Sequence, residues 1–242
     1  METENKAKFL EWDSRLFGYR IASLNLVNLS SDDLKLIIKE LEGERVRLVY
    51  CFANPSDLVS NNSLRAMSAF LADEKVTFSC SLPSQNINES SDHIESYKLN
   101  IVTPKLRLLA LQSGEFSRFR LDPRFTNNEY DKLYSVWIEN SVNKYISDEI
   151  LVFNENDSLY GFITLSIKNQ IGSIGLIAVD QEVRGKSIGK KLVNASLKYF
   201  NEKNIGEVEV VTQSANKGAC RFYESCGFKI KSIINVYHLW TI

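Results

Sequence analysis

The feature that most constrains this chain is a strand, a loop and a helix that follow one another in its last third. An apolar run ends at residues 177–180, and a loop of small and basic residues leads into an amphipathic pattern over 183–192. The first N–H groups of a helix lack intrahelical partners and lie at the positive end of the helix dipole, so such a helix start binds anions. Gly185 and Gly189 let a bulky diphosphate approach the main chain. Further positive charge comes from Arg184, Lys186, Lys190 and Lys191. The segment therefore predicts a site for a phosphate compound.

Two familiar nucleotide-binding loops do not fit this segment. A Walker A loop needs a glycine five residues before Gly185-Lys186-Ser187, and that position is Asp180. A dinucleotide fingerprint needs G-x-G-x-x-G, a spacing that the chain lacks. The phosphate compound must therefore bind in another way.

A second pattern follows the loop. Residues 207–212 alternate like a strand, and the stretch 216–228 contains Asn216, Ala219, Tyr223, Gly227 and Phe228. With the loop 184–189, it resembles the coenzyme-binding signatures of the GNAT (Gcn5-related) N-acetyltransferases, Arg/Gln-x-x-Gly-x-Gly/Ala and Asn-x-x-Ala-x-x-x-Tyr-x-x-x-Gly-Phe. The chain departs from the first signature at Ser187, which stands at its central glycine. The resemblance is closest over the last third of the chain.

The resemblance implies acetyl-CoA as cosubstrate, no metal, and a role for each matched residue. The pantetheine arm would lie along backbone groups of Leu176, Ile177 and Val179, with one strand N–H facing the thioester oxygen. Asn216 would contact the coenzyme, with a helix N-cap as the alternative. Tyr223 would protonate the departing thiolate, with a side chain closing a core edge as the alternative. The diphosphate would lie on Arg184, Gly185, Lys186, Ser187, Ile188, Gly189 and Lys190.

The expected fold class is α/β (α+β), a GNAT fold with a central mixed, mostly antiparallel sheet. We predict a small α/β domain over 1–82, a polar linker over 83–96 and the GNAT domain over 97–242. The patterns predict helices over residues 30–41, 60–70 and 129–145, with a further helical stretch at 106–111. They predict strands over residues 21–27, 46–52, 75–82, 97–102, 149–154, 159–167, 171–179, 207–212, 228–230 and 233–240.

Composition excludes several other classes of protein. A formal net charge of −1 argues against a general nucleic-acid binder. No run of 18 apolar residues exists, which argues against a membrane span, and residues 1–6 lack the apolar core of a signal peptide. We expect a cytoplasmic enzyme. Neither a metal site nor a disulfide framework is indicated by Cys51, Cys80, Cys220, Cys226, His93 and His238.

Shorter matches extend the resemblance to one branch of the family. Trp12, Phe17-Gly18 and the segments 117–120 and 137–140 resemble the dTDP-fucosamine acetyltransferases, which acetylate the 4-amine of dTDP-4-amino-4,6-dideoxygalactose during surface polysaccharide synthesis. This implies a nucleotide-linked amino sugar as acceptor. Arg118 and Arg120 are forked donors suited to its phosphates, with surface or interface salt bridges as the alternative.

The same branch implies a carboxylate on the small domain as general base, acting either directly or through a water molecule. The local match falls on residues 73–76, and Glu74 is the first candidate, followed by Asp73. The alternative is that both are exposed turn carboxylates.

Two other functions stay open. The same fold can acetylate a protein N-terminus, a peptide or a polyamine. A GNAT-like module without catalysis could bind a nucleotide or a partner, with Ser187 marking a weakened coenzyme site. A homodimer is also possible, since residues 237–240 could form an edge strand shared between subunits.

Overall fold

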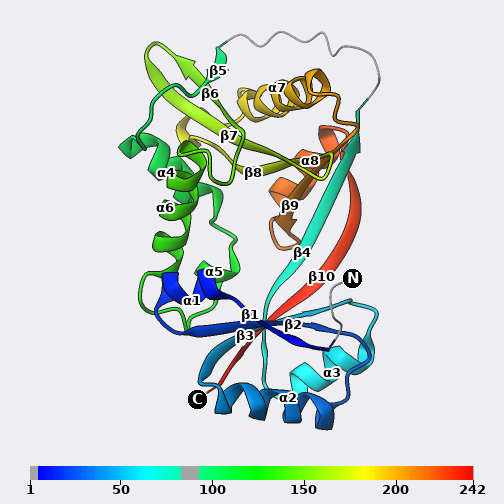
Figure 1. Ribbon diagram of the computed structural model, residues 1–242. Helices are drawn as coiled ribbons and strands as arrows, with labels where there is room; N and C mark the ends of the chain where they lie inside the picture. Colours follow the sequence, from blue (N-terminus) through cyan, green and yellow to red (C-terminus); the bar gives the residue numbers. More distant parts are fainter. Residues whose placement is uncertain (1–4, 83–92, 242) are drawn as a thin grey trace.

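The computed structural model describes residues 5–82 and 93–241, and within them ten strands form one sheet (Figure 1). The strands lie in the order β1-β2-β3-β10-β4-β9-β8-β7-β6-β5. Their bounds are β1 Ala7–Phe9, β2 Arg20–Leu26, β3 Val46–Ala53, β4 Phe70–Ser81, β5 Ile94–Ser96, β6 Glu149–Glu155, β7 Ser158–Lys168, β8 Ile171–Val179, β9 Glu207–Gln213 and β10 Lys229–Trp240.

Helices cover both halves of the sheet. Their bounds are α1 Glu11–Phe17, α2 Ser31–Gly43, α3 Leu58–Ala66, α4 Pro104–Ser113, α5 Arg118–Leu121, α6 Glu129–Val142, α7 Ile188–Glu202 and α8 Lys217–Ser225, with a 3₁₀ turn at Gln181–Val183. The Ser30 side chain accepts a hydrogen bond from the Asp33 N–H and so caps the start of α2.

The sheet is mixed and mostly antiparallel, as predicted. The pairs β2–β3 and β8–β9 are parallel, and the other neighbouring pairs in the described part are antiparallel. β4 and β10 run side by side through both halves of the molecule (Figure 1). Because β10 comes from the C-terminal part of the chain and pairs with β3 and β4 of the N-terminal part, the sheet continues across the predicted domain boundary. The division into 1–82 and 97–242 stays a prediction, and most of the predicted linker lies outside the described residues.

The predicted strand over 97–102 is absent, because the segment that pairs with β6 is the earlier β5, which ends at Ser96. The structure differs from the expected elements in four further places. The two closing strands are one strand, β10, whose register against β4 shifts between Ile230 and Ser232. β4 begins at Phe70, so the second predicted helix ends earlier, at Ala66. The stretch 117–120, expected as a loop, contains the short helix α5, and helix α1 was not predicted. All four are set by pairing or packing with distant segments, which local patterns do not report.

The position of β10 also bears on the expected homodimer. β10 lies between β3 and β4 in the interior of the sheet, so residues 237–240 are not an edge strand, and that part of the prediction is wrong. A homodimer by another surface stays a prediction.

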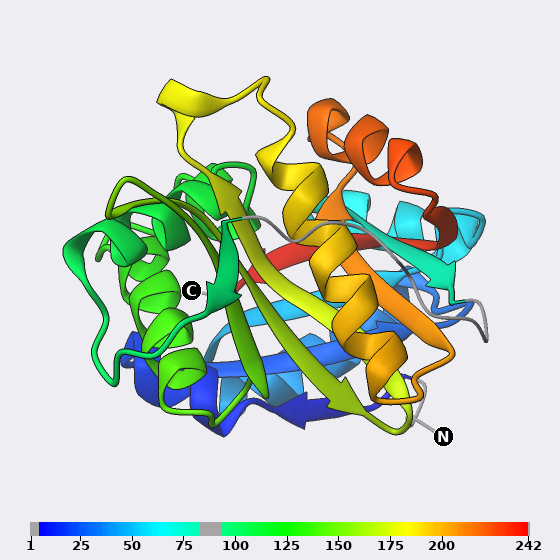
Figure 2. The same ribbon diagram turned by 90° about the horizontal axis from the view of Figure 1, so that it is seen from above.

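Helices on opposite faces of the β6–β9 half create the site. α7 and α8 pack with β4, β9, β8 and β7 around one core that includes Phe78, Leu192 and Phe200. α4 and α6 pack on the other face around Leu106, Ile138 and Phe162. In Figure 2, α7 (gold) lies across the yellow-green strands, with α8 (orange) close to its first turn. No helix in the described ranges is long and apolar enough to cross a membrane.

Candidate active site

The site begins where β8 and β9 separate. The two strands pair only from Ile171–Glu207 to Ile174–Val210, and beyond this point they diverge. The Asp180 N–H donates to the Tyr160 carbonyl of β7 at 2.7 Å. Backbone groups alternate in direction along a strand, so Val179 turns its own N–H and C=O away from β7, toward the gap. Ile177, two residues earlier, has the same orientation. The gap therefore offers strand-like partners to an extended ligand, as the resemblance implied.

A register shift between β7 and β8 lies at the narrow end of this gap. There the Leu176 N–H donates to the buried Thr164 hydroxyl at 2.8 Å, and Gly175 approaches the same hydroxyl closely. Of the three backbone positions predicted to hold the pantetheine arm, Leu176 thus has its N–H already bonded within the protein. Ile177 and the Val179 N–H are left to face the ligand, since the Val179 carbonyl accepts a hydrogen bond from the Gln112 side chain.

Thr164→Val should destabilise the protein by about 1–3 kcal/mol, because the Leu176 N–H loses its acceptor. Thr164→Ser keeps the hydroxyl and should stay close to the wild type. Urea unfolding compares the three proteins. A valine variant as stable as the serine variant would mean that the Leu176 N–H does not depend on this side chain.

The loop before α7 has the backbone geometry expected of an anion site. Gly185 has φ +82° and Ser187 has φ 60°, both in the left-handed region. Ser187 occupies the N-cap position of α7 but makes no capping bond with its side chain, so the first N–H groups of the helix are not capped by it. The left-handed backbone at Ser187 also explains why the family pattern has glycine there.

Ser187→Val should weaken acetyl-CoA binding severalfold, because a β-branched residue is disfavoured in the left-handed conformation beyond the cost that serine already bears. Ser187→Gly removes that cost and should bind at least as tightly as the wild type. Calorimetric titration with acetyl-CoA measures both. Equal affinities for valine and serine would show that the loop binds coenzyme in another conformation.

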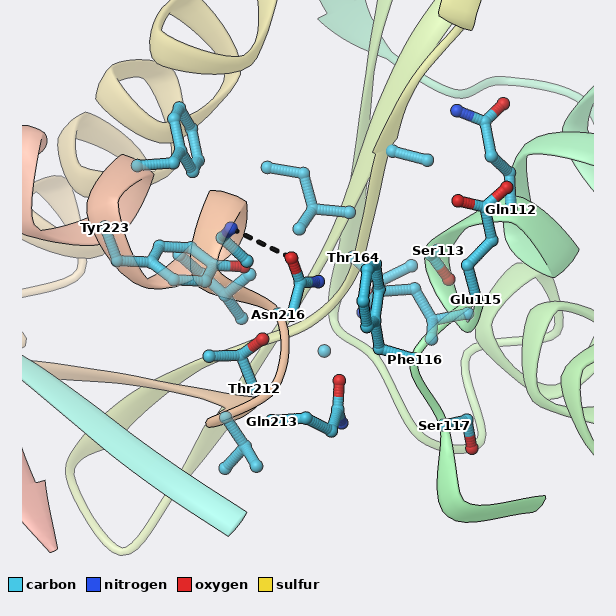
Figure 3. A pocket seen from close by; sticks show the side chains of 18 of the residues that line it. Gln112, Ser113, Glu115, Phe116, Ser117, Thr164, Thr212, Gln213, Asn216 and Tyr223 are labelled. Carbon is cyan, nitrogen blue, oxygen red and sulfur yellow. Dashed lines mark hydrogen bonds between the residues drawn. The ribbon is translucent and has the colours of Figure 1, made fainter. Parts of the chain in front are cut away.

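α8 forms one wall of the gap (Figure 3). The Asn216 side chain accepts a hydrogen bond from the Ala219 N–H at 3.0 Å, so it caps the helix, which was the alternative considered for it. Tyr223 is only 4% exposed and packs against Phe78, Phe222 and Phe228. Burial raises the pKa of the Tyr223 phenol well above its usual value of 10. The phenol is therefore protonated throughout the neutral range and can act as a donor.

One cavity of 1130 Å³ connects the loop with the opposite end of the site. Figure 3 shows Tyr223 and Asn216 on one side and Gln112, Glu115 and Phe116 on the other. A cavity of this size is sufficient for a drug-sized ligand. We call the part bordered by α1, β4, α5 and α6 the acceptor end; its lining includes Asp13, Phe52, Asp73, Lys75, Arg118, Tyr134 and Trp137.

The structure brings most of the predicted residues to this cavity. Those that line it are Arg118, Leu176, Ile177, Val179, Arg184, Gly185, Ser187, Ile188, Gly189, Lys190, Asn216 and Tyr223. Lys186, Arg120 and Glu74 are outside the lining. Arg120 is exposed on α5 beside the Tyr130 ring. For Gly189 the close neighbour is the Phe222 ring, which a Cβ would meet at 3.3 Å, so this glycine lets α7 start against α8.

The two base candidates lie on opposite faces of β4, because consecutive residues of a strand alternate. Glu74 is exposed and opposite Asn235 of β10, whereas Asp73 is half-buried and lines the acceptor end. Burial raises the pKa of Asp73 to about 7, against the lowering effect of Arg118 and Lys75. Asp73 is thus the carboxylate with both the position and the acidity of a base near neutral pH.

Two polar residues of the site were not anticipated. Gln112 donates from its side-chain amide to the Val179 carbonyl at 2.8 Å, which fixes that carbonyl beside the gap. Thr164 holds the Leu176 N–H. Neither stands in a motif, and each is recognised only from a contact between segments far apart in the chain. Within the described residues, no group of three or more potential metal ligands comes together.

Comparisons with known proteins agree with this geometry. Residues 112–228 match the model of the acetyltransferase (GNAT) family. The chain is 25% identical over 226 residues to a dTDP-fucosamine acetyltransferase of Escherichia coli O6:H1, covering 92% of this chain and 93% of that protein. It is 26% identical over 132 residues to the spore coat polysaccharide biosynthesis protein SpsD of Bacillus subtilis, covering 54% of this chain and 45% of that one.

A similar fold occurs in a solved GCN5-related N-acetyltransferase from Sphaerobacter thermophilus. The TM-score is 0.62 at 16% identity, and the alignment covers 97% of this chain and 76% of that one. At this identity the likeness concerns the fold alone.

Proposed function

Since the chain belongs to the GNAT family of N-acetyltransferases, we propose that it transfers the acetyl group of acetyl-CoA directly to a primary amine of a small molecule. We further propose that this amine is carried by a nucleotide-linked amino sugar of the dTDP-4-amino-4,6-dideoxyhexose type, in the cytoplasm and in surface polysaccharide synthesis. Support for the sugar comes from the names of two relatives, a dTDP-fucosamine acetyltransferase and a spore coat polysaccharide biosynthesis protein.

The observation that carries the transferase proposal is the continuity of the cavity. The same cavity is lined by the loop of α7, by Tyr223 and by Asp73. A thioester bound along β8 would therefore have an acid candidate from α8 and a base candidate from β4 in the same cavity. Holding reactants in one geometry is a large part of what such an enzyme needs, because a thioester is already activated.

The proposed reaction uses residues of this chain at each proton transfer. The nitrogen lone pair of the amine attacks the thioester carbon, and the oxyanion that forms accepts hydrogen bonds from N–H groups of β8 at Ile177 or Val179. The C–S bond then breaks, and the sulfur leaves as a thiolate that takes a proton from the Tyr223 phenol. The amine nitrogen gives its extra proton to Asp73. Solvent restores both side chains.

The proposal is tested with purified protein, acetyl-CoA and a panel of acceptors, by following release of the free thiol of CoA. The panel contains dTDP-4-amino-4,6-dideoxygalactose, a peptide with a free N-terminus, and spermidine. The sugar nucleotide should give the highest kcat/KM. A higher value for the peptide or spermidine would move the proposal to that acceptor class. If acetyl-CoA does not bind up to millimolar concentration, the chain is a binding module and not a transferase.

A further inference from the structure

Arg118 occupies an unusual position for a residue that was expected to bind phosphate. Its guanidinium lies 4.1 Å from the centroid of the Tyr50 ring and 4.7 Å from that of Phe119. The atom Nη1 is buried and has no hydrogen-bond partner in the described part of the chain. A planar guanidinium held against aromatic rings keeps a fixed orientation, which an ammonium group in the same place would not.

Two carboxylates lie at the same end of the cavity as this arginine. Asp13 comes from α1 and Asp73 from β4, and both line the acceptor end together with Arg118. α5, which begins at Arg118, packs against β4. For each carboxyl group burial raises the pKa, and Arg118 is the largest opposing influence. The guanidinium thus compensates two acids that have been partly removed from water.

Other groups around this pair are few and come from known elements. Asp73 is also influenced by Lys75, which lowers its pKa, and by Glu74, which raises it, both on β4. Arg118 faces Tyr50 of β3 and Tyr134 of α6 in addition to the two aspartates. Burial raises the pKa of Tyr50 and Tyr134 above 10, so both phenols are neutral near pH 7. Arg118 and Lys75 are therefore the cations that act on Asp73.

The charges near Arg118 argue against its use as a phosphate clamp. Asp13 and Asp73 line the same end of the cavity as Arg118 and would repel a phosphate there, whereas the cavity-lining cations Arg184 and Lys190 lie in the loop and first turn of α7. We propose instead that Arg118 is a positioning residue, whose positive charge at the acceptor end keeps Asp73 ionised there so that Asp73 can take the proton of the acceptor amine. This inference rests on the proposed function, because it assigns Asp73 as the base of acetyl transfer.

The test is the pH dependence of kcat/KM with one acceptor, so that the ionisation of the amine is the same for every variant. An ionised Asp73 is required, and the rate therefore falls as the pH drops through its pKa. We call the fall of kcat/KM on the acidic side of the profile the acid limb. Arg118→Gln removes the positive charge that lowers the pKa of Asp73, so the acid limb should move to higher pH by about one unit, with activity recovering above it. Asp13→Asn removes the second carboxylate near Arg118, so that the arginine acts on Asp73 alone, and the acid limb should move to lower pH.

Controls separate positioning from loss of structure. Arg118→Lys keeps the charge without the planar stacking and should leave the limb near its wild-type position with a lower kcat. Arg47→Gln is a matched control, because Arg47 also stacks on aromatic rings, Tyr19 and Trp240, but does not line the cavity; its limb should not move.

The outcomes distinguish the two proposals. Opposite shifts for Arg118→Gln and Asp13→Asn support the inference, and if Arg118→Gln does not fold, Asp13→Asn and Arg118→Lys decide it. If the wild type is active and the acid limb does not move in these variants, the inference about Arg118 is wrong, and the proposed function is unaffected. A wild type that binds acetyl-CoA and acetylates no amine overturns the proposed function.

Discussion

Tyr223→Phe is expected to lower kcat for acetyl transfer about 10²-fold or more, because it removes the donor to the departing thiolate. The ring is packed by Phe78, Phe222 and Phe228, so phenylalanine fills the same space and the fold should be unchanged. The hydroxyl is the one group lost. Steady-state kinetics with calorimetric measurement of acetyl-CoA affinity separates the loss of chemistry from a loss of binding.

The pH dependence makes this prediction specific. Since burial raises the pKa of Tyr223 well above 10, the phenol does not titrate between about pH 6 and 9, and the deficit should be constant over that range. Tyr199→Phe is a suitable control, because Tyr199 of α7 is also partly buried but does not line the cavity. A Tyr223→Phe enzyme with wild-type kcat would leave the phenol as a packing residue at the edge of the core.

The coenzyme half of the site was largely predictable from sequence because its residues are close together in the chain. The loop 184–190 and the start of α7 form a local anion site whose geometry depends on glycine, on one left-handed residue and on a helix start. The helix that begins after Asn216 was equally local. Apart from Lys186, the predicted residues of this loop line the cavity, because few long-range contacts are needed to place them, and their role in coenzyme binding stays a prediction.

The acceptor half could not be predicted to the residue, because it is assembled from α1, β3, β4, α5 and α6. Between β4 and β10 the register shifts near Ala72: Asp73 is opposite Val236, but Leu71 is opposite Tyr237. Such a shift changes which residues of a strand share a face. The local match over 73–76 favours Glu74 before Asp73, but which of the two faces the cavity depends on pairing with β10, a strand more than 150 residues away in the chain.

Asp73→Asn is expected to lower kcat/KM about 10²-fold or more, because the amide cannot accept the proton of the attacking amine. Asparagine is close to isosteric, and Asp73 makes its contribution at the acceptor end, far along the cavity from the loop of α7, so acetyl-CoA affinity should stay near that of the wild type. Glu74→Gln on the opposite face of β4 should have a small effect.

The pH dependence of the rate gives a second test of this assignment. The pKa of Asp73 is raised to about 7, so its ionised fraction and the wild-type rate should both rise as the pH increases through 7. Asp73→Asn should lack this rise, and its residual rate should follow the ionisation of the amine alone. The reverse result, a large loss in Glu74→Gln and little change in Asp73→Asn, would identify Glu74 as the base acting from outside the cavity, and would require water to carry the proton around the edge of β4.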